Sequence, residues 1–349
     1  MHRISRAATA TAALVFLWLS LASIGRASAA PVLIDAGNSP VIAVQLRGGQ
    51  LTVRTWNRNQ VQIDAQGPVD WFHATARQVA NNLPTSQTIL AQTAQTPNGP
   101  VTLPPETFVL PQLSPGPHEG VRIVGDGAAI ITIPQGTALV LARVGFGGID
   151  LQGYHQGAFF AAVRNGDIAL RDVSGTGFAQ VVKGPILVDA SSFDRIRART
   201  GTGMLFFEGC TSQQIELTSV RGSIAYDNGS FQPGLARFES QYGNIALGIG
   251  AGGAQVTAHG ANGRVYTEFG GRSNVSIVGG DARGAVGGGG PTVTASAANG
   301  AMLVYDGALR DHPSITAAVP EMRALLSRAT SKNYHPAGQR TRRRQRPPF

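Results

Sequence analysis

The chain has 349 residues, of which 42% are hydrophobic and only 14% are charged, and its 45 glycines amount to about 13% of the chain, roughly twice the usual share. This composition excludes a coiled coil, and a mean hydropathy of 0.00 without a long apolar run after the N-terminal stretch excludes a multi-span membrane protein. The net charge of +9 does not indicate a basic binding groove, because it comes from the two ends of the chain, and residues 30–331 sum to about zero.

Residues 1–29 have the pattern of an export signal. Arg3 and Arg6 precede an apolar stretch over 7–24, and Ala27-Ser28-Ala29 is a small-x-small cleavage site. An uncleaved N-terminal anchor is the alternative, since a stretch of this length is at the short limit for spanning a bilayer. Cys210 is the single cysteine, so neither a lipoprotein signal nor an internal disulfide is expected. We predict an exported protein, in the periplasm, on the cell surface or extracellular, without a transmembrane segment after cleavage.

Residues 30–67 are predicted to form an N-terminal β segment. Its clearest part is a pair of alternating strands over 49–56 and 60–63, separated by a polar turn at Asn57-Arg58-Asn59. The stretch 68–120 then becomes rich in Gln, Thr and Pro, which indicates an insertion or long excursion. Such excursions often carry function, and equally often are simple insertions.

Repetition is the strongest signal in residues 121–310. A Gly-x-apolar-x-apolar pattern recurs at intervals of 18 to 21 residues and then once at 37, at Gly127, Gly147, Gly166, Gly184, Gly203, Gly222, Gly243, Gly263 and Gly300. A second alternating strand precedes several of these glycines, and three such strands end in Thr200, Ser219 and Ser240. A unit of this size buries its apolar face only against copies of itself. The pattern therefore predicts an all-β fold, a parallel β-helix-like β-solenoid with rungs of about 20 residues; an antiparallel β-sandwich is the alternative.

The polar positions of these strands are expected to face outward, with opposite charges interleaved between rungs. They comprise Asp167, Arg171, Arg197, Arg199, Glu216, Arg237, Glu239 and Arg264.

The C-terminal part is predicted to hold a short helical cap over 311–331 and a disordered, Arg-rich tail over 332–349. Pro320 to Thr330 is the helix candidate, with Met322, Leu325 and Leu326 as its apolar face, and we expect it to cover the open end of the solenoid. Five tail residues form a candidate site for polyanions such as envelope polymers, and a merely solvated tail is the alternative. They are Arg340, Arg342, Arg343, Arg344 and Arg346.

Several of these features together resemble a known family. Val53, Trp56, the polar turn, Val61 and Ile63 are followed by Ile131-Thr132-Ile133-Pro134 and by rungs such as Gly166-Asp167-Ile168 and Gly243-Asn244-Ile245. This pattern resembles the bacterial putative-adhesin domain family of unknown function. The resemblance covers Val41 to Ile63 and Val121 to Asp306, and it implies an exported β-solenoid at the cell envelope with no catalytic residues to carry over.

No catalytic, cofactor or metal-binding residues are assigned. The sequence lacks His-Glu-x-x-His, cysteine pairs, a phosphate-binding Lys-Ser/Thr after its glycine runs and a Gly-x-Ser-x-Gly elbow. We therefore expect a non-enzymatic, adhesin-like protein that binds or scaffolds at the bacterial envelope. Its expected partner is an envelope polysaccharide or another anionic envelope polymer, with no specific binding of nucleic acid.

Two alternatives remain open. One is a self-associating structural envelope protein. The other is a polysaccharide lyase or glycoside hydrolase of the β-helix type, in which Asp150 with Asp167, or Glu216 with Glu239, would supply the two carboxylates.

Overall fold

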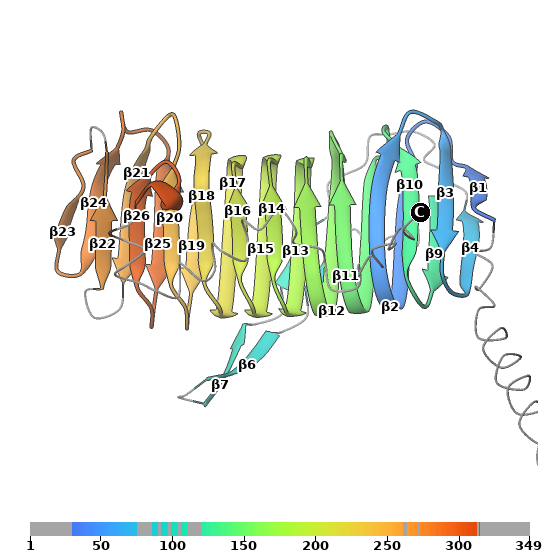
Figure 1. Ribbon diagram of the computed structural model, residues 1–349, viewed down its shortest axis with the longest axis horizontal. Helices are drawn as coiled ribbons and strands as arrows, with labels where there is room; N and C mark the ends of the chain where they lie inside the picture. Colours follow the sequence, from blue (N-terminus) through green and yellow to red (C-terminus); the bar gives the residue numbers. More distant parts are fainter. Residues whose placement is uncertain are drawn as a thin grey trace, which may run out of the picture.

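The described part of the chain is all-β. The computed structural model describes residues 30–74, 86–89, 92–96, 99–103, 106–109, 120–260, 264–270, 273–312 and 314. Within these residues, 22 strands belong to one sheet and four more form two separate pairs. Figure 1 shows the strands side by side in an elongated stack, with the N-terminal strands at one end and the C-terminal strands at the other.

The central strands form two parallel series that advance by one unit at a time. The first series pairs β13 (Ser174–Lys183) with β15 (Ser192–Thr202), β15 with β17 (Thr211–Arg221), and β17 with β19 (Ala236–Ser240). The second pairs β14 (Ile186–Asp189), β16 (Leu205–Glu208), β18 (Ile224–Phe231) and β20 (Ile245–Ile249) in the same order. Because these pairings are parallel, the antiparallel sandwich is the wrong alternative.

The two parallel series meet at the long strand β12 (Gly157–Arg171), which pairs on its other side with the long strand β11 (Leu139–Gln152). β11 pairs with β12 along its length. The first half of β12 then pairs with β13, and its last four residues pair with β14. Because β17 also pairs with β18, the pairings close into a ring of seven strands, β12-β13-β15-β17-β18-β16-β14.

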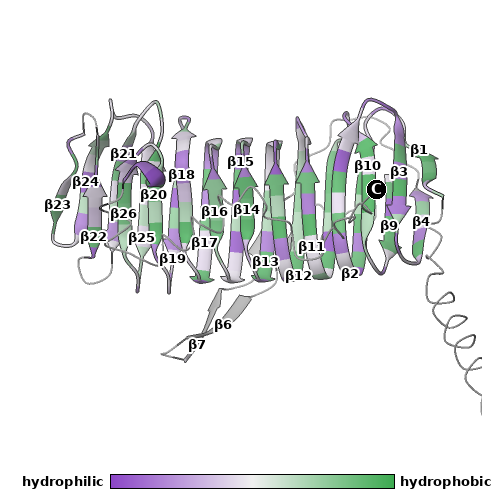
Figure 2. Ribbon diagram, in the orientation of Figure 1, coloured by the Kyte–Doolittle hydropathy of each residue, from purple (hydrophilic) through white to green (hydrophobic). Residues whose placement is uncertain are grey.

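Alternating side chains build a continuous core between the series. Ile168, Ile186, Leu205 and Ile224 are register partners from one strand to the next, and each is fully buried. Two residues further along, Phe207 and Tyr226 stack in the same way. The alternation of hydrophobic and hydrophilic residues along the strands is visible in Figure 2, and it is the period that places one face of a strand against a core.

The repeated glycines lie in a column at the turn between the two series. A β-carbon on Gly203, whose φ is +144°, would lie 2.0 Å from the carbonyl oxygen of Gly184, and other glycines of the repeat have the same relation to the preceding one. Two of the three hydroxyls noted before the turns support the column, since Thr200 Oγ1 donates to the carbonyl of Gly184 and Ser240 Oγ to that of Gly222. The glycine positions of the repeat are thus fixed by close backbone approach.

The units at both ends are out of sequence order, and here the predicted succession of rungs is wrong. β2 (Val41–Trp56) pairs with β11 on one side and with β9 (Gly120–Gly125) and β10 (Ala129–Pro134) on the other. The earliest unit therefore lies between two later ones. Antiparallel strands finish this end: β3 (Gln60–Ala65) pairs with β1 (Val32–Asp35) and β10, and β4 (Val69–Ala74) pairs with β9.

The C-terminal end repeats this arrangement. β26 (Met302–Asp306) lies between β20 and β22 (Val265–Glu268), and β25 (Thr292–Ala297) lies between β19 and β21 (Ala254–Gly260). Gly300 consequently approaches Gly243, the repeat glycine on the neighbouring unit. β24 (Asp281–Val286) and β23 (Ser276–Val278) add antiparallel strands beyond β21, and a 3₁₀ helix (Leu309–Asp311) follows β26.

The predicted excursion contains strands of its own. β5 (Ser86–Ile89) pairs with β8 (Glu106–Val109), and β6 (Gln92–Thr96) pairs with β7 (Gly99–Leu103), all antiparallel. β6 contacts β15 and β17 on the main stack. The export signal over 1–29, the helix candidate Pro320 to Thr330 and the tail over 332–349 lie outside the described residues.

Candidate functional site

The sequence-derived sites lie partly outside the described residues. This is the case for the tail arginines Arg340, Arg342, Arg343, Arg344 and Arg346. Within the described chain, the predicted interleaving of charge is present on the β15–β17–β19 face, where Arg197, Glu216 and Arg237 are register partners. Arg197 Nη2 lies 2.8 Å from Glu216 Oε2.

Two residues predicted to be exposed are buried. Arg199 and Asp167 are each only 2% exposed, although both lie at outward positions of their strands. Arg199 lies on β15, which is one of the two strands of the main stack that β6 of the excursion contacts. The alternation of the sequence gives the direction of a side chain but not what lies over it.

The carboxylate pairs considered for an enzyme are not register partners. Asp150 lies opposite Ala169, and Asp167 lies opposite Gly148. Glu216 lies opposite Arg197 and Arg237, whereas Glu239 lies opposite Thr218 and forms an ion pair with Arg237, at 3.3 Å.

A different set of carboxylates is stacked in register. Asp189 of β14, Glu208 of β16 and Asp227 of β18 are consecutive register partners, so adjacent members are about one strand spacing, roughly 4.8 Å, apart along the backbone. We call these three residues the carboxylate ladder. The sequence contained its signal, because each member follows a rung glycine, Gly184, Gly203 or Gly222, by five residues.

Burial raises the pKa of two members of the ladder, Glu208 and Asp227. Burial, followed by the neighbouring charges of Asp227 and Asp189, raises the pKa of Glu208 above its usual range, and the cation of Arg310 opposes this. Burial likewise raises the pKa of Asp227. Asp227 Oδ1 accepts hydrogen bonds from the Tyr305 hydroxyl at 3.0 Å and from the backbone N–H of Leu309 at 2.8 Å, which ties the 3₁₀ helix to the ladder.

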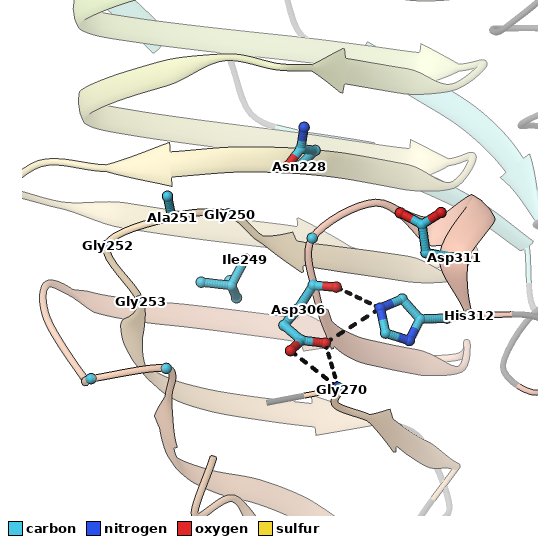
Figure 3. Close-up of a pocket in the computed structure, with 13 residues that line it drawn as sticks. Asn228, Ile249, Gly250, Ala251, Gly252, Gly253, Gly270, Asp306, Asp311 and His312 are labelled. Carbon is cyan, nitrogen blue, oxygen red and sulfur yellow. Dashed lines mark hydrogen bonds and ion pairs between the residues drawn. The ribbon is translucent and has the colours of Figure 1, made fainter. Parts of the chain in front are cut away.

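An open groove lies beside the last member of the ladder. It has a volume of about 670 Å³, and Figure 3 shows Asp306, Asp311, His312 and Asn228 around it, together with the glycine-rich turn over 250–253. Gly270, Gly287 and Gly288 also line it. Since glycines leave backbone groups uncovered, the wall offers main-chain donors and acceptors as well as these polar side chains.

Asp306 and His312 define the polar floor of the groove. Both carboxylate oxygens of Asp306 accept from the backbone N–H of Gly270, at 2.9 and 3.1 Å. His312 Nε2 lies 3.4 Å from Asp306 Oδ1, and its Nδ1 lies 3.8 Å from Glu268 Oε1. The imidazole also packs on the Tyr305 ring, with centroids 5.3 Å apart. The groove can thus exchange hydrogen bonds with a hydroxyl-rich ligand, whereas Ile249 is the one large apolar side chain among its lining residues.

The described ranges contain no group of three or more His, Cys, Asp and Glu residues that could hold a metal ion. No helix in the described part of the chain is long and apolar enough to cross a bilayer.

Comparisons with known proteins give little further information. No family model matches the sequence, and no curated protein matches it. Among solved structures, one match is the crystal structure of "a putative cell adhesion protein" from Clostridium sporogenes ATCC 15579, with 10% sequence identity and a TM-score of 0.20, covering 79% of this chain and 97% of that chain. A likeness at this TM-score carries no argument about the present chain, so the resemblance to the adhesin family stays a prediction.

Proposed function

We propose that this chain is an exported, non-enzymatic, adhesin-like β-solenoid that presents a repetitive surface for binding or scaffolding at the bacterial cell envelope. The observation that carries the proposal is the in-register stacking of central units, whose pairings advance by 18 or 19 residues from β12 to β14, β16 and β18. Each such unit contributes the same outward positions, so a regular array of side chains results.

The proposed ligand is an envelope polysaccharide. Asp306, Asp311, Asn228 and the glycine backbone of the groove match the donors and acceptors of sugar hydroxyls. The Arg340 to Arg346 cluster of the tail would add attraction to an anionic polymer.

The test is co-sedimentation of residues 30–349 with isolated cell envelopes across a salt series, in parallel with a chain ending at Ser331 and an Asp306→Asn variant. Binding by the truncated chain at high salt that weakens in Asp306→Asn supports recognition by the folded body. Binding that disappears with the tail and falls steeply with salt assigns attachment to the arginines alone and contradicts a role for the groove. An absence of binding at every salt concentration overturns the proposal.

Self-association is a second candidate, favoured by the exposed edge strands. Ile277 and Val278 on β23 are 48% and 71% exposed, and Leu33 on β1 is 53% exposed. Edge strands with apolar side chains can pair with another copy. A sedimentation coefficient that rises with concentration, and no longer rises in Val278→Lys, would support this candidate; a monomer at all concentrations would exclude it.

A polysaccharide-cleaving activity is the remaining candidate, favoured by the raised pKa of Glu208 beside Asp227, as a general acid requires. The test is incubation with several acidic and neutral polysaccharides, followed by assays for new reducing ends and unsaturated products. An activity that Glu208→Gln abolishes would support the enzyme, and its absence across all glycans would exclude it.

A further inference from the structure

A strip of outward-facing apolar residues runs along the second series. Starting at β12, its members are register partners from strand to strand: Ala169, Leu187, Phe206, Ala225, Ala246 and Leu303. We call these six residues the apolar strip. They point away from the core between the two series, because their sequence neighbours Ile168, Ile186, Leu205, Ile224, Ile245 and Met302 point into it.

The side chains of the strip have little exposed surface, although they point away from the core between the two series. Phe206 is only 4% exposed and Leu303 is fully buried, and the small residues Ala169, Ala225 and Ala246 are between 0 and 3% exposed. Neighbours within a flat sheet cannot cover a phenylalanine that stands perpendicular to it. At the C-terminal end of the strip, Leu309 of the 3₁₀ helix joins the same cluster as Leu303 and Tyr305. The other described members of this cluster are Phe206, Ala225, Ala246 and Ala301, with Leu187, Met204 and Tyr266 packed against them.

The chain leaves the described region at one end of the strip. Ser314 Oγ lies 3.4 Å from Glu268 Oε1 on β22, and Tyr266, two residues before Glu268 on the same strand, is the register partner of Leu303. From Ala169 to Leu303 the strip crosses five strand spacings, about 24 Å. An 11-residue helix over 320–330 would be about 16 Å long, and the residues that precede it can supply the remaining distance.

The charges beside the strip also favour the chain segment that follows Ser314. The carboxylate ladder, Asp189, Glu208 and Asp227, borders the strip, since each member follows Leu187, Phe206 or Ala225 by two residues. The segment 315–331 carries Arg323 and Arg328 with Glu321 as its one acid, while Met322, Leu325 and Leu326 are apolar. We propose that residues 315–331 dock along the apolar strip, with their apolar side chains on it and their arginines toward the carboxylate ladder. The segment then covers the side of the stack rather than its open end.

Limited proteolysis of the full chain with trypsin tests this docking. Arg323 and Arg328 lie inside the segment, whereas Lys332, Arg340 and Arg342 follow it. Mass spectrometry should find cleavage at Lys332 and beyond first, with cleavage at Arg323 and Arg328 at least tenfold slower. Equal rates of cleavage at Arg323 and Arg342 would overturn the proposal.

A pair of matched variants tests which face of the segment docks. The double variant Leu325→Asp, Leu326→Asp should raise the rate of cleavage at Arg323 and Arg328 about tenfold and increase the fluorescence of a dye that binds exposed apolar surface. The control Ala324→Asp, Ser327→Asp introduces the same charge on the opposite face of the expected helix and should leave both readouts unchanged. Equal effects of the two variants would contradict the docking. So would a dimer at micromolar concentration in which protection of Arg323 disappears on dilution, because the strip would then belong to a second copy.

Discussion

Replacement of Gly203 by alanine tests the glycine column, the feature that sets the spacing of the turns. At a φ of +144° an alanine is strained, at a cost of about 1–3 kcal/mol. The new β-carbon would also lie 2.0 Å from the Gly184 oxygen and 2.4 Å from its carbonyl carbon, and relief of such an overlap by backbone shifts costs about 1–3 kcal/mol more. We therefore expect Gly203→Ala to lower the free energy of unfolding by about 2–6 kcal/mol.

Gly209→Ala is the matched control. Gly209 also has a positive φ, of +60°, but a β-carbon there would meet nothing within 4 Å, so only the left-handed backbone cost of about 1–2 kcal/mol applies. Urea denaturation followed by far-UV circular dichroism measures both variants. If the urea midpoint of Gly203→Ala falls no further than that of Gly209→Ala, close approach between rungs is not what selects glycine at the column.

Three further predictions concern Tyr305, Glu208 and Cys210. Tyr305→Phe should lower the free energy of unfolding by about 1–3 kcal/mol, measured by urea denaturation, because it removes a hydrogen bond to buried Asp227; an unchanged midpoint would contradict this. Since the pKa of Glu208 is raised in the folded chain, its protonated form contributes stability that is complete below the usual pKa of a glutamate and is lost as the pH rises through the folded value. Glu208→Gln should therefore increase the urea midpoint at pH 8 relative to the parent and have little effect at pH 4, and a loss of stability at pH 8 would refute the burial argument. Burial raises the pKa of the Cys210 thiol to about 12, so a maleimide at pH 7.5 should label Cys210 only after denaturation, and stoichiometric labelling of the folded chain would contradict its burial.

The repeat could be predicted because the same residue types recur at equivalent positions of successive units. Gly166, Gly184 and Gly203 recur where two backbones approach closely, and the alternating residues after them lie in the core. Thr200 and Ser240 recur three residues before a repeat glycine, and each donates a hydrogen bond to the carbonyl of the preceding repeat glycine. These features depend on contacts between equivalent positions, which a single sequence displays directly.

The remaining features depend on contacts between dissimilar segments. Nothing in the residues of β2 or β26 indicates that each lies between two other units, because their alternation would be the same in any register. The burial of Arg199 depends on what crosses its sheet, and the groove around Asp306 on the meeting of several glycine turns with the residues after β26. The carboxylate ladder is different, since its constant offset from the rung glycines was readable in the sequence.

The placement of β2 and β26 between other units has a consequence for how such a chain can change its length. In the middle of the stack, each unit pairs only with the preceding and the following one, so duplication or deletion of about 19 residues there would preserve every pairing type. At the ends, β2 must fit between β10 and β11, and β26 between β20 and β22. An extra unit at either end would separate strands that now share a partner. Evolutionary gain and loss of repeats in this architecture should therefore be confined to the interval between β12 and β18, while both end assemblies keep a constant length.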